Sequence, residues 1–144
     1  MKSVTGLAKV LNNFGRLNKL IARGAEKGLL RGGALVLRAS MKQVPVDKSN
    51  LKPSGFTRNL GGSGIHSDVV VGYTADYAVY VHENTDAAHG EEFNKKHKDE
   101  ISKGQTHSRG KGQKAKFLED PMRESTREVV QVVKKSVLEE MTKI

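Results

Sequence analysis

Residues 17–44 read LNKLIARGAEKGLLRGGALVLRASMKQV and decide the fold, because their apolar residues recur every three or four positions. This spacing predicts one long amphipathic helix. The side chains of Leu17, Ile21, Ala25, Leu29 and Val36 share one side of it, and Leu30, Leu37, Met41 and Val44 widen the apolar sector. We call the bases on the remaining arc the basic stripe: Arg16, Lys19, Arg23, Lys27, Arg31, Arg38 and Lys42.

Glycines interrupt this helix at regular intervals. Gly24, Gly28 and Gly32 lie four residues apart, and Gly33 follows. Each costs about 1 kcal/mol relative to alanine inside a helix. The row therefore allows two interpretations: a flat strip on which another backbone packs closely, or a break near Gly32.

The sequence before and after this stretch sets its limits. Residues 4–14 predict a separate short amphipathic helix, which Gly15 breaks or bends. At the other end, Pro45 disfavours the helical conformation of the residue before it, so the long helix is expected to end at Val44.

The middle of the chain predicts a small antiparallel sheet. Residues 56–60 are a candidate short strand, and residues 65–72 and 77–83 are better ones, joined by the short link 73–76. Alternation along residues 77–83 would place Tyr77 and Tyr80 on opposite faces, one in the core and the other outward.

The last third of the chain contains a polar stretch and then a helix. Residues 84–116 carry seven Lys, one Arg, five acids and three His, with only Phe93 and Ile101 as large apolar residues. Such a stretch builds no core of its own and is expected to be an extended loop. A helix is predicted from Pro121 to about Lys143, with Asp120 as its N-cap. We therefore expect a single α+β domain over residues 1–144, with a long N-terminal helix and a C-terminal helix packed on a small antiparallel sheet.

Composition limits the possible functions. The chain has 144 residues, 36% hydrophobic, without tryptophan, which indicates a modest aliphatic core or stabilisation by neighbouring subunits. It has no cysteine, no apolar run that could span a membrane and no apolar N-terminal signal, so we expect no disulfide, no membrane partner and a chain made in a cytoplasm. The net charge is +9, and residues 1–46 carry nine bases against one acid, Glu26. An acidic partner is therefore expected.

No pattern of catalytic or metal-binding residues stands out. His82, His89, His97 and His107 fit no zinc spacing. The GGSG sequence at residues 61–64 is followed by no Lys-Ser/Thr and no predicted helix, as a phosphate-binding loop would require. A hydrolytic triad of Ser54 or Ser63 with a histidine and Asp76 has no support in the spacing. We expect no catalytic residues, no metal, no cofactor and no enzymatic activity.

Three motifs occur in a recognisable order. Residues 45–54 read PVDKSNLKPS and align with Pro-Val-Asp-Thr-Gly-x-Leu-x-x-Ser, with Lys-Ser in place of Thr-Gly. Residues 71–85 read VGYTADYAVYVHENT and align with Val-Gly-x-x-x-x-Tyr-Ala-x-Tyr-Val-Glu-x-Gly-Thr, with His82 inserted and Asn84 at the glycine. Residues 117–121 read FLEDP before the final helix. Over roughly residues 20–85 and 115–142, the chain resembles the tail-completion, or minor capsid, family of long-tailed bacteriophages.

The resemblance implies a structural role in the virion. It implies a homo-oligomeric, often hexameric, ring in the neck that joins the DNA-filled head to the tail. The implied partners are head-closure or adaptor ring proteins and the tail terminator or tail tube protein. The chain would be found in the host cytoplasm during assembly and then in the neck of the particle.

On this interpretation we assign two sets of contact residues. The basic stripe would contact genomic DNA in the axial channel without sequence readout, or acidic residues of a flanking ring. Subunit contacts are assigned to Tyr77, Tyr80, Glu83, Phe93 and Ile101. The alternative function is a basic nucleic-acid-binding or capsid-associated minor protein, although aromatic residues for base stacking are scarce.

Overall fold

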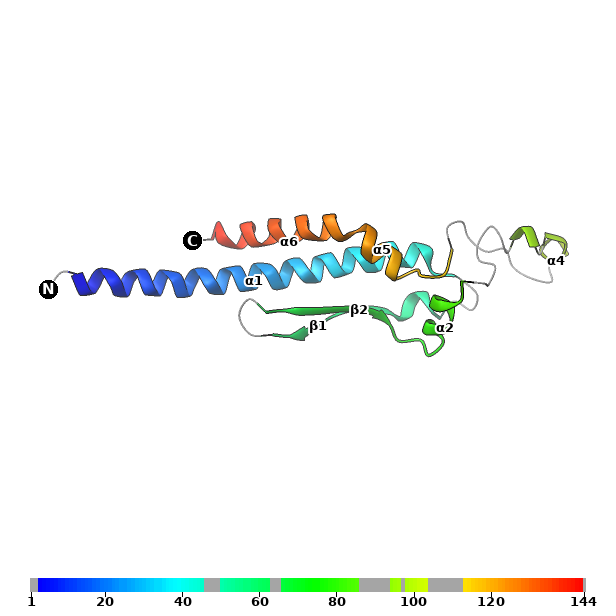
Figure 1. The fold of residues 1–144 in the computed structure, drawn as a ribbon, viewed down its shortest axis with the longest axis horizontal. Helices are drawn as coiled ribbons and strands as arrows, with labels where there is room; N and C mark the ends of the chain where they lie inside the picture. Colours follow the sequence, from blue (N-terminus) through cyan, green and yellow to red (C-terminus); the bar gives the residue numbers. More distant parts are fainter. Residues whose placement is uncertain are drawn as a thin grey trace. The chain divides into compact units, whose positions relative to one another are not determined.

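A computed structural model describes residues 3–45, 50–62, 66–85, 94–96, 98–103 and 113–143 (Figure 1). Its elements, in chain order, are α1 (Ser3–Gln43), the 3-10 turn η1 (Lys52–Ser54), β1 (Gly55–Gly61), β2 (Asp68–Tyr73), α2 (Ala78–Glu83), α4 (Lys98–Ser102), α5 (Glu119–Glu124) and α6 (Thr126–Met141). The strands β1 and β2 form one two-stranded antiparallel sheet. The α+β class is confirmed, with a long N-terminal helix, a C-terminal helix and a small sheet.

Helix α1 is continuous over 41 residues. The predictions of a separate helix over residues 4–14 and of a break near Gly32 are therefore wrong. A single glycine such as Gly15 costs about 1 kcal/mol, which flanking leucine, lysine and alanine residues offset. The helix ends where predicted, since its last residue, Gln43, comes just before Val44 and Pro45.

The described residues divide into two compact units. The first contains Met1–Gly33, Arg58–Val70 and Arg127–Ile144, and the second contains Ala34–Thr57 and Val71–Thr126. Helix α1 and both strands contribute residues to each unit.

In the first unit, α6 packs antiparallel against α1 along the glycine row (Figure 1). A Cβ atom added to Gly24 would lie 2.6 Å from Cα of Val137, and one added to Gly28 would lie 2.6 Å from Cα of Val133. Side chains at these positions would overlap the partner backbone, so the glycines allow the two helices to touch. The interpretation as a close-packing strip is confirmed. On another side of α1, Nδ2 of Asn59 in β1 donates a hydrogen bond to Glu26 at 2.7 Å.

In the second unit, a small core forms around Val44, Leu51, Ala78 and Phe117, all buried. Partly buried Tyr73, Ala75, Val81 and Leu118 pack against this core. The buried hydroxyl of Ser40 lies 2.7 Å from the hydroxyl of Tyr73, so this polar pair is satisfied internally.

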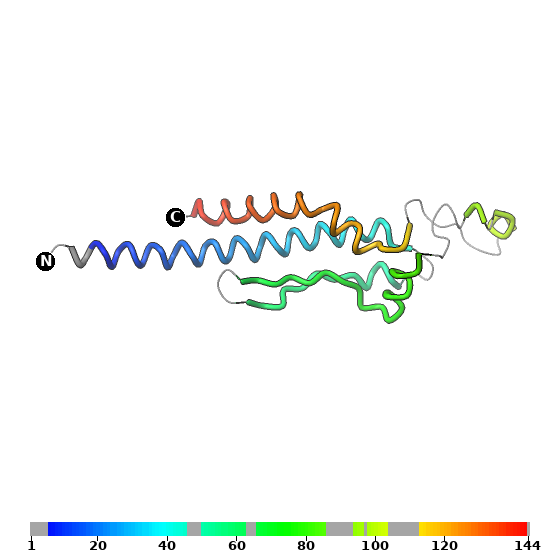
Figure 2. The backbone as a smooth tube through the Cα atoms, in the orientation of Figure 1, coloured from blue at the N-terminus to red at the C-terminus, as the bar shows by residue number. Residues whose placement is uncertain are grey.

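The hairpin is displaced along the chain from its predicted position. The paired strands are β1 and β2, which lie side by side in Figure 2, whereas residues 78–83 form helix α2. The prediction of a strand over residues 77–83 is wrong, because alternation and β-branching are weak signals in a short segment. The helical conformation places Ala78 and Val81, three residues apart, against the Phe117 core.

The C-terminal helical region consists of two helices that meet at Ser125. Asp120 is not an N-cap, since it lies within α5 and its amide donates to the carbonyl of Lys116 at 3.0 Å. Its carboxylate pairs with Nζ of Lys114 at 2.6 Å instead. Pro121 is the third residue of α5, within the first turn, where a missing N–H costs no helical hydrogen bond.

The polar stretch 84–116 is partly structured. Residues 98–102 form α4. At the C-terminal end of the polar stretch, the amide of Lys114 donates a hydrogen bond to the carbonyl of Gln43 at 3.0 Å. The amide of Lys116 donates one to the carbonyl of His82 at 2.8 Å. These two bonds fix the end of the stretch beside α1 and α2, so residues 113–116 belong to the second unit.

Candidate interaction surfaces

All seven residues of the basic stripe are exposed on α1, but two of them already form ion pairs within the chain. Nζ of Lys27 lies 2.5 Å from Oε1 of Glu140. The guanidinium of Arg31 donates to Glu139 at 2.9 Å and to the hydroxyl of Ser136 at 3.0 Å. Lys27 and Arg31 thus join α1 to α6, while both side chains stay more than half exposed.

Glu140 is the centre of this intrachain cluster. Its side chain is only 7% exposed, and it accepts from Lys143 at 2.6 Å as well as from Lys27. The hydrogen bonds from Lys143 and Lys27 lower the pKa of Glu140 to about 2. The carboxylate is thus ionised over the whole physiological pH range.

Five bases of the stripe remain: Arg16, Lys19, Arg23, Arg38 and Lys42. No acid in the described part of the chain forms an ion pair with them. Arg16, Lys19 and Arg23 fall on one arc of α1 within the first unit, and at about 100° per residue they span roughly 60°. They form a compact positive surface that is free to meet phosphates or carboxylates.

The two assigned interface tyrosines are both on the surface. Tyr77 is 39% exposed and Tyr80 is 80% exposed, so the expectation that one of them enters the core is wrong. Ala78 takes that place, because α2 is a helix and turns a different residue inward. Val79, at 69% exposed, extends the surface that Tyr80 forms.

Glu83 is tied to the segment that precedes α5. Its carboxylate pairs with Nζ of Lys116 and lies 2.8 Å from Nδ1 of His82. The hydrogen bond from Lys116 lowers the pKa of Glu83, and the same bond raises the pKa of Lys116. Lys116 adopts a left-handed backbone with φ of 55°. Nothing local in the sequence marks this residue as a partner of Glu83, which is 33 positions away.

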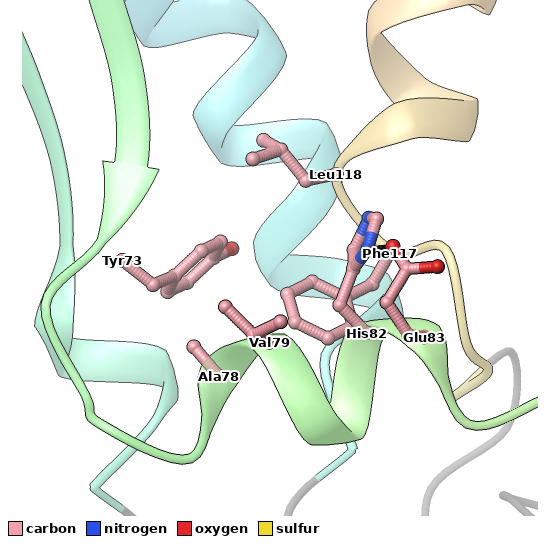
Figure 3. A pocket seen from close by; sticks show the side chains of 7 residues that line it. All are labelled: Tyr73, Ala78, Val79, His82, Glu83, Phe117 and Leu118. Carbon is pink, nitrogen blue, oxygen red and sulfur yellow. Dashed lines mark hydrogen bonds and ion pairs between the residues drawn. The ribbon is translucent and has the colours of Figure 1, made fainter.

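An apolar pocket of about 250 Å³ opens beside α2 in the second unit (Figure 3). It is lined by Tyr73, Ala78, Val79, His82, Glu83, Phe117 and Leu118. The ring of Phe117 meets Tyr73 and His82 edge to face, with ring centroids 5.3 Å and 5.0 Å apart. The aromatic rings and Leu118 give the pocket a mostly apolar lining.

Both ring nitrogens of His82 have partners within the second unit. Nδ1 faces Glu83, and Nε2 accepts a long hydrogen bond of 3.4 Å from the amide of Glu119. These two contacts fix the orientation of the His82 ring beside the pocket.

The remaining assignments fall in or near the polar stretch. Ile101 is half-buried in α4. Phe93, His89, His97 and His107 lie outside the described residues. Among the residues that are described, no group of three His, Cys, Asp or Glu side chains could hold a metal ion.

No helix in the described part of the chain has both the length and the apolar character needed to cross a membrane. In comparisons with known proteins, no protein-family model, curated protein or solved structure matches this chain.

Proposed function

We propose that this chain is a structural subunit of the neck of a long-tailed bacteriophage, where copies form a tail-completion ring between the head and the tail. The motif order at residues 45–54, 71–85 and 117–121 supports this family assignment. Its partners would be the head-closure or adaptor ring on one side and the tail terminator or tail tube on the other.

One structural observation carries the proposal: many large apolar side chains lie on the surface. Twelve large hydrophobic side chains of the described residues are more than a third exposed, whereas five large ones are buried: Leu20, Val36, Val44, Leu51 and Phe117. Apolar side chains that are grouped on a surface are typical of protein–protein contact sites. A subunit that is covered on several sides by neighbours would bury this surface.

The exposed side chains form groups on different elements. They lie near the start of α1, on both strands, on α2, on α5 and on α6. A ring subunit needs at least two different contact faces, because each subunit presents one face to the next subunit and another face to the previous one.

The five remaining bases supply the polar contact that the proposal requires. In a ring, they would face the DNA that passes through the channel or the acidic rim of an adjoining ring. Lys27 and Arg31 would contribute less charge to this contact, since they already pair with Glu140 and Glu139.

The decisive experiment follows the chain into particles. We expect purified virions to contain it in a small fixed copy number, and a phage that lacks its gene to accumulate separate heads and tails. Complementation with the wild-type chain should restore joining. Normal joined particles that form without the chain would contradict the proposal.

A second function is favoured by the compact surface of Arg16, Lys19 and Arg23: nucleic-acid binding by a basic minor protein. That function predicts binding of duplex DNA by the isolated chain, with an affinity that falls steeply as salt rises. Replacing these three bases with glutamine should then abolish binding, whereas the matched change at Arg38 and Lys42 should weaken it less. Failure of wild-type binding at low salt would remove this candidate.

A further inference from the structure

We infer that the first turns of α1 form an arm that pairs with the same arm of a second copy of this chain. Because the same surface meets itself, this contact is isologous and is separate from the head-to-tail contacts that would close the proposed ring. The N-terminal arm is defined as residues 3–19, and its apolar stripe as Leu7, Val10, Leu11, Phe14 and Leu17.

The arm extends past its helical neighbour. Helix α6 ends at Met141, and Val137, one turn earlier, packs on Gly24. Because the two helices are antiparallel, the last turn of α6 reaches about residue 20 of α1 (Figure 1). The 17 residues of the arm therefore continue about 25 Å beyond the end of α6.

The uncovered part of the arm is apolar. Leu7 is 62% exposed, Val10 50%, Leu11 63% and Phe14 60%. Their spacing of three and four residues matches the seam of a coiled coil. Within the described residues, no other element covers this seam.

The apolar stripe continues a face that already binds a helix. At about 100° per residue, the stripe occupies a sector of roughly 120°, and Gly28 and Gly32 fall inside the same sector. Those glycines contact Val133 and Val129 of α6. The stripe therefore extends the groove in which α6 lies, and a second helix fits that extension.

The charge pattern favours a second copy as the occupant. Lys9 and Lys19 lie on the arc opposite the stripe, and uncharged Ala8 and Asn13 lie on its flanks. These two lysines are thus about 10 Å, one helix diameter, from whatever covers the stripe. Arg16 lies nearer, since it lines a surface hollow of about 300 Å³ together with residues of the stripe. Two stripes meet without bringing the lysines together, whereas an acidic surface on the stripe would gain little from lysines at that distance.

The size of the arm sets the expected strength. A specific interface buries about 800 Å² per partner. One face of a helix 25 Å long and about 10 Å wide offers only a fraction of that area. The isolated chain should therefore associate with a dissociation constant between about 1 μM and about 1 mM, and further ring contacts would strengthen the contact.

The first test is analytical ultracentrifugation of the full chain at protein concentrations from about 1 μM to about 1 mM. We expect a concentration-dependent mass increase that Phe14→Asp weakens at least about tenfold. The matched control is Asn12→Asp, which places the same charge at an exposed position on the opposite arc of the same arm and should change nothing. A monomer at all concentrations, or equal loss in both variants, would overturn the inference. The inference would also be overturned if Phe14→Asp weakened binding to lipid vesicles and left self-association unchanged.

The second test uses the absence of cysteine in the chain. Val10 lies near the middle of the stripe, so two stripes that pair about a two-fold axis bring the two Val10 side chains close together. Val10→Cys should form a disulfide-linked dimer under mild oxidation, and Asn12→Cys, on the opposite arc, should not. Equal yields, or no dimer from Val10→Cys, would contradict the pairing.

The two proposals fail separately. Virions that contain the chain but give no Val10→Cys dimer would refute the arm contact and leave the neck function intact. A dimer in solution from a chain that is absent from virions would refute the neck function and leave the arm contact intact.

Discussion

Adding one methyl group at Gly28 should separate α1 from α6. A Cβ atom there would lie 2.6 Å from Cα of Val133, about 0.8 Å short of ordinary van der Waals contact. The obstacle is backbone, so the helices must move apart rather than a side chain rotate. Alanine gains about 1 kcal/mol in helix propensity over glycine. Overpacking costs about 1–3 kcal/mol and more where backbone must shift. We therefore expect Gly28→Ala to lower the free energy of unfolding by about 1–2 kcal/mol.

The matched control is Gly15→Ala in the same helix, where nothing lies within 4 Å of the added Cβ atom. It should raise the free energy of unfolding by about 1 kcal/mol. Urea unfolding followed by circular dichroism measures both changes. Adding Gly24→Ala to Gly28→Ala should cost less than the sum of the two, because one separation relieves both overlaps. If Gly28→Ala proves as stable as Gly15→Ala, the close helix contact is wrong.

Two further predictions concern the second unit and the α1–α6 ion pairs. Phe117→Ala should lower the free energy of unfolding by about 3–5 kcal/mol, because the ring is 1% exposed at the centre of its core; a loss under about 1 kcal/mol in urea unfolding would show that the core does not depend on it. The pKa of Glu140 is about 2 when folded and 4.5 ordinarily, so its ion pairs stabilise fully above pH 4.5 and lose that effect as pH falls toward 2. The stability difference between wild type and Glu140→Gln should therefore be largest near neutral pH and vanish toward pH 2, and a difference that persists at pH 2 would contradict the ionic role of Glu140.

The long helices could be predicted because their signals are local. Apolar spacing of three and four residues located most of α1, and Pro45 located its end. The glycine row left two interpretations open, since spacing alone does not reveal that Val133 and Val137 lie against it. That choice depends on a contact between residues more than a hundred positions apart.

The errors arose where tertiary contacts outweigh local preference. Residues 77–83 alternate like a strand, yet Ala78 and Val81 pack on Phe117 only in a helix. The capping pattern at Asp120 was overridden by its ion pair with Lys114. Arg31 looked like part of a continuous basic surface because its acidic partner, Glu139, lies at the far end of the chain.

Of the candidate contact surfaces, the sequence located the bases better than the apolar patches. The exposed positions of Arg16, Lys19 and Arg23 follow directly from helical periodicity. The exposure of Leu7 and Phe14 does not, because an apolar stripe predicts burial and only the end of α6 at Met141 leaves this stripe bare. An apolar stripe without a partner among the described residues supports the proposal that other copies of the chain cover it.

The account therefore depends on where this surface is buried. The most direct measurement is an electron cryomicroscopy reconstruction of the intact neck of the particle in which we propose that the chain resides. We expect a closed ring of identical copies between head and tail, with the arm apolar stripes covered by protein. A neck resolved to side chains without this chain, or with its arms bare to solvent, would contradict the account.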